Sequence, residues 1–218
     1  MMKTAIMGAA ACFAAFTSVS ANAATNIELV TNDDDWTVAD VLSDGSVGTA
    51  SPAIENRAAT SWVKDDGSNA ATGDAKWITP SDKKNVPVGN YVYTTVIELT
   101  NLGGYTWNGT YWADNAIVSI LVNGTELLAP DRLQGNFKSD TGNPLFDNDV
   151  FLSAGEKTIS FEVRNANNGG NNPSGLLINS LFTAVPEPAT WIMMIFGLAA
   201  AGGAMRRQKK ANVRIQFA

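Results

Sequence analysis

The stretch Lys157-Thr158-Ile159-Ser160-Phe161-Glu162-Val163-Arg164 (KTISFEVR) has the clearest alternating pattern in this 218-residue chain. Its apolar residues Ile159, Phe161 and Val163 occupy every second position, and polar or charged residues fill the positions between them. A period of two is the signature of a β-strand with one buried and one exposed face. The stretch therefore predicts a half-buried strand.

Two further segments extend this β pattern. In residues 91–99, Tyr91, Tyr93, Ile97 and Leu99 share one face at the same period. Residues 116–122 and 125–128 are apolar runs joined by Asn123-Gly124. That dipeptide favours a type I′ turn, because both central residues of such a turn need positive φ. The pattern predicts a β-hairpin.

Further strands complete the pattern, and no stretch of the mature domain shows a sustained helical period. Expected strands cover residues 27–30, 36–39, 76–78, 150–152 and 175–182. About eight strands separated by Gly, Asn and Asp turns are typical of a sandwich. We expect an all-β domain over residues 24–184, a β-sandwich of the jelly-roll kind. Residues 105–112 join two of the expected strands, so some of their aromatic rings should lie on a loop.

The N-terminus has the three parts of a secretory signal peptide over residues 1–23. Lys3 precedes an apolar run from residue 5 to 16, and Ala21-Asn22-Ala23 supplies small residues for cleavage after Ala23. The alternative is an N-terminal helix that is retained. Cys12, the only cysteine, lies in this leader, so the mature chain would contain no thiol.

The C-terminus carries a second apolar run. Residues 189–205 hold no charge and would extend about 26 Å as a helix, the short limit for a transmembrane segment. The basic cluster 206–210 follows and favours the cytoplasmic side, with residues 211–218 as a cytoplasmic tail. Pro186 and Pro188 disfavour helix upstream.

These C-terminal features occur in the order of a known signal. Val185-Pro186-Glu187-Pro188-Ala189-Thr190-Trp191, the pair Met193-Met194 and the pair Arg206-Arg207 resemble the PEP-CTERM sorting signal of Gram-negative bacteria. The resemblance implies an exosortase as partner and cleavage near Pro-Glu-Pro. The apolar helix would hold the chain at the inner membrane until cleavage, and the product would reach the cell surface or an extracellular matrix that contains exopolysaccharide.

Charge and composition exclude several functions for the middle domain. Twenty of the 21 acidic residues but only nine of the 15 basic ones lie within residues 24–185, so the net charge there is −11. Such a surface repels nucleic acid. The chain has no histidine, which excludes Ser-His-Asp triads and histidine-ligated zinc catalysis. Catalysis by carboxylates stays open.

A second resemblance covers residues 36–182. The segments 75–80, 89–99, 109–124 and 155–168 resemble a galactose-binding-like jelly roll, which is similar to carbohydrate-binding modules. The resemblance implies a structural calcium ion, the only cofactor expected, because such modules often carry one. Asp33, Asp35, Asp147 and Asp149 are the candidate ligands, since calcium binds carboxylate oxygens. The alternative is that these residues are solvated loop aspartates.

Aromatic and amide side chains are the candidates for glycan binding. Tyr105, Trp107 and Tyr111 could stack on the apolar faces of sugars, and Asn167 and Asn168 could bind hydroxyl groups. The alternative for the rings is burial in the core, and for the asparagines a plain connecting loop.

Together these features predict an exported, non-enzymatic surface protein that binds exopolysaccharide. One alternative is a structural matrix protein that associates with copies of itself. Another is a glycoside hydrolase, which needs two carboxylates about 5–10 Å apart. Asp114 and Glu98 are the candidate pair for that reaction.

Overall fold

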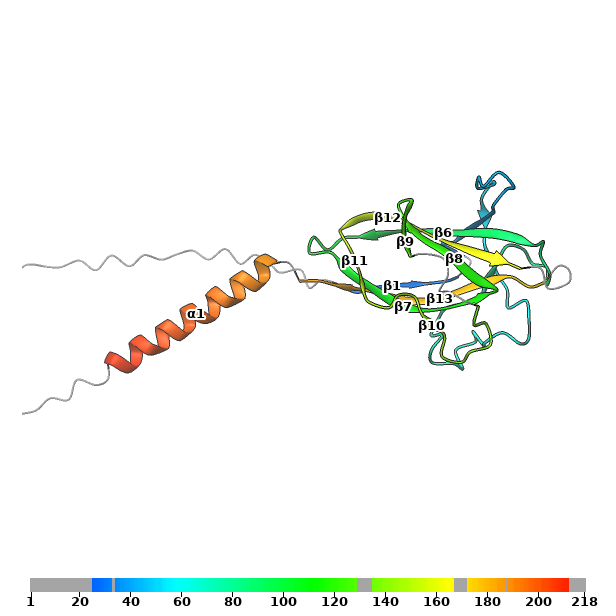
Figure 1. Ribbon diagram of the computed structural model, residues 1–218. Coiled ribbons are helices and arrows are strands. Elements are labelled where there is room, and N and C mark those ends of the chain that lie inside the picture. Colours follow the sequence, from blue (N-terminus) through cyan, green and yellow to red (C-terminus); the bar gives the residue numbers. More distant parts are fainter. Residues whose placement is uncertain (1–24, 33, 129–134, 167–171, 187, 212–218) are drawn as a thin grey trace, which may run out of the picture.

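The computed structural model describes residues 25–32, 34–128, 135–166, 172–186 and 188–211. Two antiparallel sheets face one another, and a helix projects from one end of them (Figure 1). The predicted signal peptide with Ala21 and Ala23, and residues Asp33, Asn167, Asn168 and Glu187, lie outside the described residues.

Sheet A has the order β10-β7-β13-β5-β4, with β1 also paired to β13 and β11 to β7. Its strands are β1 (Ile27–Val30), β4 (Ile54–Glu55), β5 (Ile78–Thr79), β7 (Tyr105–Asp114), β10 (Asn143–Pro144), β11 (Val150–Leu152) and β13 (Gly175–Ala184). Strands β7 and β13 form its centre and pair along their whole length, from Gly175 opposite Asp114 to Ala184 opposite Tyr105.

Sheet B has the order β3-β2-β6-β12-β8-β9. Its strands are β2 (Thr37–Asp40), β3 (Ser51–Pro52), β6 (Gly89–Leu99), β8 (Ala116–Val122), β9 (Thr125–Leu128) and β12 (Gly155–Asn165). The opening stretch KTISFEVR is the middle of β12, which pairs with β6 on one side and β8 on the other. Strand β12 is therefore one of the two central strands of this sheet. Its regular alternation of apolar and polar residues agrees with that position.

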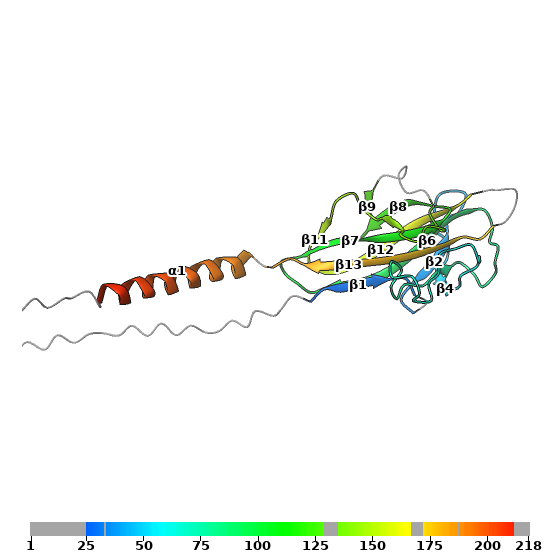
Figure 2. The same cartoon turned by 90° about the horizontal axis from the view of Figure 1, so that it is seen from below.

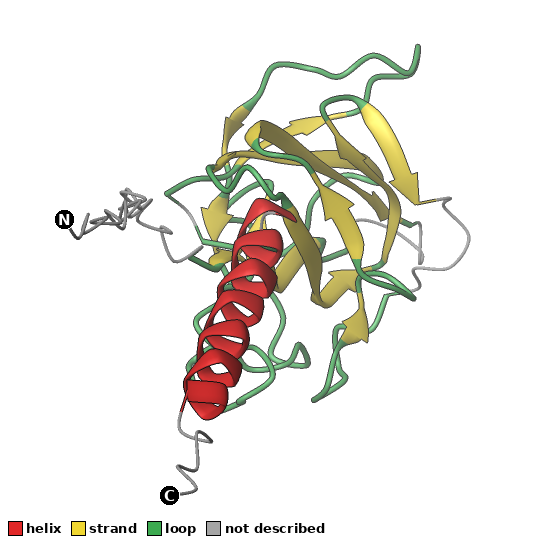
Figure 3. Cartoon of the chain, turned by 90° about the vertical axis from the view of Figure 1, so that its left-hand side faces the viewer, coloured by secondary structure: helices red, strands yellow, loops and turns green. Residues whose placement is uncertain are grey.

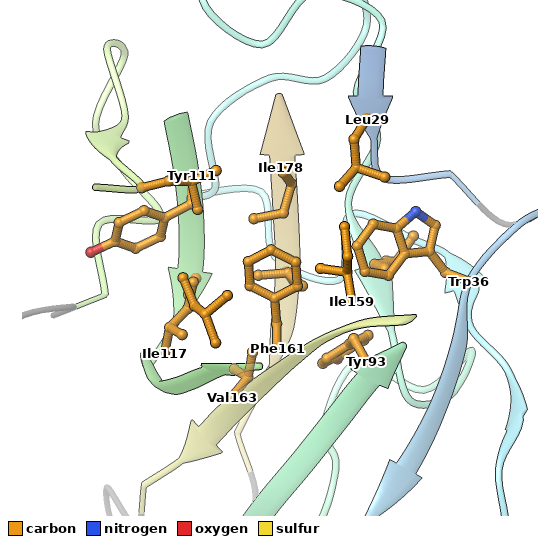
Figure 4. Packing of buried hydrophobic residues seen from close by; sticks show 14 of the residues in the cluster. Leu29, Trp36, Tyr93, Tyr111, Ile117, Ile159, Phe161, Val163 and Ile178 are labelled. Carbon is orange, nitrogen blue, oxygen red and sulfur yellow. The ribbon is translucent and has the colours of Figure 1, made fainter. Parts of the chain in front are cut away.

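The main core fills the space between the sheets. Ile159, Phe161 and Val163 of β12 are fully buried and point toward Ile178 and Tyr111 of sheet A (Figure 4). The Phe161 ring lies 6.2 Å from the Trp107 ring in an edge contact, and Trp107 stacks on Phe182 at 5.1 Å. These rings join the two sheets, and their burial supplies much of the hydrophobic stabilisation.

The predicted β-sandwich is confirmed, and several strands have the bounds that the pattern predicts. Strands β1, β8, β9 and β11 agree residue for residue, and β6, β12 and β13 are slightly longer than expected. The Asn123-Gly124 turn has φ of 51° and 75°, as a type I′ turn requires.

The expected loop within residues 105–112 is wrong, because residues 105–114 form strand β7. Tyr105, Trp107 and Tyr111 alternate along its inner face. Gly109 interrupts the pattern where β7 passes close to β13, and a Cβ atom there would overlap the backbone of Ser180. The glycine thus permits the close approach of the two strands and also hides the period of two.

Helix α1 (Pro188–Ala211) begins at the second proline of the Pro-Glu-Pro motif. Proline suits the first helical position, where its missing N–H costs no hydrogen bond. The helix projects away from the sandwich (Figures 1 and 3). Its residues Trp191, Ile195 and Phe196 are more than half exposed. The expected helix is confirmed. Its expected membrane span over residues 189–205 is not, since no helix in the described residues combines the length and hydropathy needed for a crossing.

Replacing Phe161 with alanine should lower the free energy of unfolding by about 3–5 kcal/mol, because the cavity lies at the contact between the sheets. Chemical denaturation of residues 24–185 measures this change. Val96→Ala in the neighbouring strand β6 is the control, since Val96 is 55% exposed and its loss should cost at most about 0.5 kcal/mol. Equal effects of the two substitutions would contradict the assigned core.

Candidate functional site

A second apolar cluster covers the outer face of sheet A. Trp112 of β7 and Leu177 of β13 point away from the main core and pack against Trp62 and Trp77. The Trp62 and Trp77 rings lie 4.3 Å apart. The loop from residue 56 to 77 and the segment 135–141 form this outer layer, and the Val63 N–H joins them by donating to the Phe137 carbonyl at 2.6 Å.

An open pocket of about 490 Å³ lies in this outer layer. Its lining is mostly polar or charged and consists of Arg57, Thr60, Ser61, Trp62, Val63, Lys64, Ser68, Asn69, Ala70, Lys138 and Asp140. The Asn69 amide donates to the Asp140 carbonyl at 2.9 Å, and the Trp112 indole donates to the Ser139 carbonyl at 2.7 Å. These bonds fix segment 138–140 beside the residues of the longer loop.

Three cations from separate positions meet at this pocket. Arg57, Lys64 and Lys138 line it, against the single carboxylate of Asp140. The domain as a whole carries a net charge of −11, so a lining with three cations and one carboxylate differs from the general character of the surface, although Asp66 also interacts with Lys64 and Asp114 with Lys138. The serine and threonine hydroxyls and the Asn69 amide add hydrogen-bonding groups. Such a lining can bind an anionic group together with neighbouring hydroxyls.

Asp114 lies beneath the pocket and is only 5% exposed. Its Oδ2 accepts from the Trp62 indole N–H at 2.8 Å, and its Oδ1 accepts from the Asn115 amide at 2.8 Å. Burial raises the pKa of this carboxyl, while the Trp62 hydrogen bond and the Lys138 charge partly offset the effect. Asp114 therefore positions Trp62, at the base of the pocket.

The three rings predicted to bind glycan do not face solvent. Tyr105, Trp107 and Tyr111 are at most 1% exposed, and their polar atoms contact protein groups. The Trp107 indole donates to Ser180 Oγ at 3.1 Å, and Tyr111 Oη accepts from the Asn143 amide at 3.3 Å. Placing these rings in a sugar-binding loop is therefore wrong, since the inner face of β7 belongs to the core. The two asparagine candidates, Asn167 and Asn168, lie outside the described residues.

Of the four predicted calcium ligands, the structure describes Asp35, Asp147 and Asp149, and these three do not form a metal-binding group. Asp35, Asp147 and Asp149 are exposed, and Asp149 Oδ1 accepts from the Asn108 amide at 3.1 Å. Within the part of the chain that the structure describes, no three acidic, cysteine or histidine side chains form a metal-binding group. Asp33 lies outside that part, and a structural calcium ion stays a prediction.

The candidate glycosidase pair is separated along the sandwich. Asp114 ends β7 two residues before Ala116, which lies in register with Arg164 and, through it, with Asn90. Glu98 is eight residues farther along β6 than Asn90, and eight steps in a strand span about 27 Å. The two carboxylates therefore lie toward opposite ends of the sandwich, too far apart for the two-carboxylate mechanism.

The Pro-Glu-Pro segment follows directly on the central strand β13. Val185 donates its N–H to the Gly104 carbonyl at 2.9 Å, Pro186 is exposed, and α1 starts at Pro188. Arg206 lies near the C-terminal end of the helix, and Arg207 is the next helical residue. The structure thus places the helix directly after the Pro-Glu-Pro segment and the basic pair near the C-terminal end of that helix.

This segment matches a described protein family over residues 184–210. Residues 184–210 are a PEP-CTERM protein-sorting motif. The PEP-CTERM motif indicates export and sorting to the cell surface. It covers only this part of the chain, and no curated protein matches the sequence.

Solved structures resemble the sandwich. A family 35 carbohydrate-binding module from Clostridium thermocellum is 14% identical with a TM-score of 0.41, over 72% of this chain and 99% of that chain. A β-galacturonidase from Eisenbergiella tayi bound to galacturonate is 11% identical with a TM-score of 0.38, over 72% of this chain and 24% of that chain. An exo-β-1,3-galactanase from Phanerochaete chrysosporium is 15% identical with a TM-score of 0.34, over 70% of this chain and 28% of that chain. The chain spans about a quarter of each enzyme, and likeness at this level carries nothing about ligand or activity.

Sequence patterns did not indicate the pocket, because its parts are not local. Arg57 and Lys64 flank Trp62 in an acidic domain, and this spacing is the one signal that could have drawn notice. Lys138 and Asp140 reach the same place only because segment 135–141 folds over Trp112.

Asp114→Asn should remove a pH-dependent part of the stability. The raised pKa in the folded state means that the folded protein binds a proton more readily than the unfolded chain. Stability from this group is therefore greatest in acid and decreases as pH rises through the folded pKa.

The measurement is urea unfolding of the parent and the variant between pH 4 and 7, where the difference in unfolding free energy, parent minus variant, should fall as pH rises. Asp140→Asn, the same substitution at an exposed residue of the pocket lining, serves as the matched control. A parent that gains stability relative to Asp114→Asn toward pH 7 would contradict this assignment.

Proposed function

We propose that this protein is sorted to the cell surface by an exosortase and there binds an acidic extracellular polysaccharide, without catalysing a reaction. The observation that carries the binding proposal is the pocket in which Arg57, Lys64 and Lys138 meet on an otherwise acidic domain. The PEP-CTERM motif supports the location, because it indicates the cell surface.

The ligand class follows from the charge of the pocket and of the domain. A polymer with carboxylate, sulfate or phosphate groups is repelled by the general surface and attracted at this one position. The alcohol and amide side chains around the cations match sugar hydroxyls. Each exposed charge pair contributes at most about 1 kcal/mol, so a single sugar unit binds weakly. A polysaccharide repeats that unit, and many surface copies of the protein can bind one polymer together.

The position of the pocket also suits a surface protein. Trp62 contacts Asp114 and packs against Gly175, the first residue of β13, whereas the PEP-CTERM motif follows Ala184 at the other end of that strand. Nine steps along a strand separate the two ends by about 30 Å. Figure 1 shows the outer loops at one end of the sandwich and α1 at the other. The pocket therefore lies toward the end of the sandwich opposite the sorting motif.

The separation of Asp114 from Glu98 supports the non-enzymatic part of the proposal. The pocket lining includes one carboxylate, Asp140, whereas the usual glycosidase mechanisms use two. Asp114, which accepts from the lining residue Trp62, is buried and also engaged by Asn115. Self-association into a matrix stays an alternative prediction, and sedimentation at increasing concentration separates it from monomeric binding.

The double variant Lys64→Ala with Lys138→Ala should weaken binding to an acidic polysaccharide such as polygalacturonate by about 3- to 30-fold. This range corresponds to the loss of two exposed charge interactions. Affinity electrophoresis or calorimetry with residues 24–185 measures it.

Lys83→Ala with Lys84→Ala is the matched control, since it removes the same charge from exposed positions that do not line the pocket. A neutral glucan gives the second comparison and should bind more weakly than the acidic polymer. Equal losses in the two double variants would contradict the pocket, and absence of binding to every polysaccharide, including the host's own, would contradict the function.

A further inference from the structure

We propose that Asn101 and Gly104 form a clasp on Val185 that sets the upstream limit of sorting cleavage. The mature chain then ends at Val185 or beyond it, with β13 complete. This inference rests on the proposed processing by an exosortase and adds to it the position of the new C-terminus and the residue that protects it. The loop 101–104 connects β6 to β7, beside the end of β13 from which the sorting motif leaves (Figure 2).

The backbone of Val185 is bound on both sides. Its N–H donates to the Gly104 carbonyl at 2.9 Å, and its carbonyl accepts from the Asn101 amide at 2.6 Å. The same amide donates to the Gly104 carbonyl at 2.8 Å. One asparagine side chain thus ties Val185 to the loop, and the pairing of β13 with β7 extends one residue past Ala184.

Hydrogen bonds and a glycine conformation fix the backbone of the clasp loop. The Gly104 N–H donates to the Asn101 carbonyl at 2.8 Å, and the Asn101 N–H donates to the Tyr105 hydroxyl at 3.3 Å. Gly104 has a φ of +81°, and a Cβ there would lie 2.8 Å from the Leu152 carbonyl oxygen. Only glycine suits this position. Tyr105, which does not reach solvent, thus has a structural role at the clasp.

Strand β13 cannot enter a protease cleft while it remains in the sheet. It pairs with β7 along its length and with β1 from Val30 to Ile27, and the Ala184 N–H donates to Asn26 Oδ1 at 3.2 Å. Phe182 at this end stacks on Trp107 in the core. Cleavage upstream of Val185 would first require this end of the sandwich to unfold, whereas proteases cut most readily where the chain is exposed and unpaired.

The first proline of the motif ends the protected region. Pro186 follows Val185, is exposed, and has no N–H with which to continue the ladder. The boundary of the folded domain therefore coincides with the start of the Pro-Glu-Pro motif. After cleavage the clasp keeps the new C-terminal residues paired, so the sandwich loses no core contact when the tag is removed.

The test uses the full-length chain in a Gram-negative host that has an exosortase. Intact-mass measurement of the surface form should show one C-terminus, at Val185 or later. Amide exchange by NMR on the purified full-length chain should show protection at Val185. Asn101→Asp keeps the shape of the side chain, removes its two N–H donors and places a carboxylate against two carbonyl groups. Exchange at Val185 should then increase about tenfold or more, and surface termini should become ragged and extend into β13.

Asn56→Asp is the control, because the Asn56 amide also donates to a backbone carbonyl, that of Asp82, at a distant loop. It should leave the Val185 exchange and the C-terminus unchanged. A wild-type terminus within residues 175–184 would overturn the clasp while confirming processing. Retention of residues 189–210 in the surface form would contradict processing, and the inference with it. If Asn101→Asp does not fold, the C-terminus and the Val185 exchange of the wild-type protein still test the inference.

Discussion

The contact between Phe161 and Trp107 joins the two sheets, and the rest of the sandwich depends on it. Phe161 lies on a central strand of sheet B, and Trp107 lies on β7 with Phe182 of β13 stacked against it. Burying these rings removes a large apolar area from water, the main favourable term in folding. Because adjacent residues of a strand point to opposite faces, fixing Trp107 inward also fixes Trp112 outward.

That outward face is what creates the candidate site. Trp112 and Leu177 would be exposed on sheet A without a cover, and the loop 56–77 supplies it by packing Trp62 and Trp77 over them. The indole N–H groups of this layer are all engaged, that of Trp62 by Asp114, that of Trp77 by Val63 and that of Trp112 by Ser139. The packed tryptophans thus form a rigid apolar support for the cationic side chains of the pocket, and binding sites are commonly built on such rigid elements.

The antiparallel pairing of β1 with β13 has a consequence for both ends of the domain. The described chain enters the sandwich at Thr25, beside the point at which β13 leaves toward the sorting motif. The N-terminal end of the domain and the sorting motif therefore lie at one end of the sandwich, and the cation-lined pocket lies toward the other.

The sequence by itself determined the features whose physics is local. The alternation in KTISFEVR, the Asn-Gly turn and the strand from Ala116 to Val122 follow from side-chain period and backbone φ, and the PEP-CTERM motif is contiguous. Only the tertiary structure decided which tryptophans lie in the core, since the sequence Tyr105-Thr106-Trp107 is compatible with both a loop and a central strand. Gly109 interrupts the alternating pattern of that strand. The glycine is needed because Ser180 approaches the backbone there, and Ser180 is 71 residues away in the chain. The pocket was equally hidden, because Lys138 and Lys64 become neighbours only through packing on Trp112.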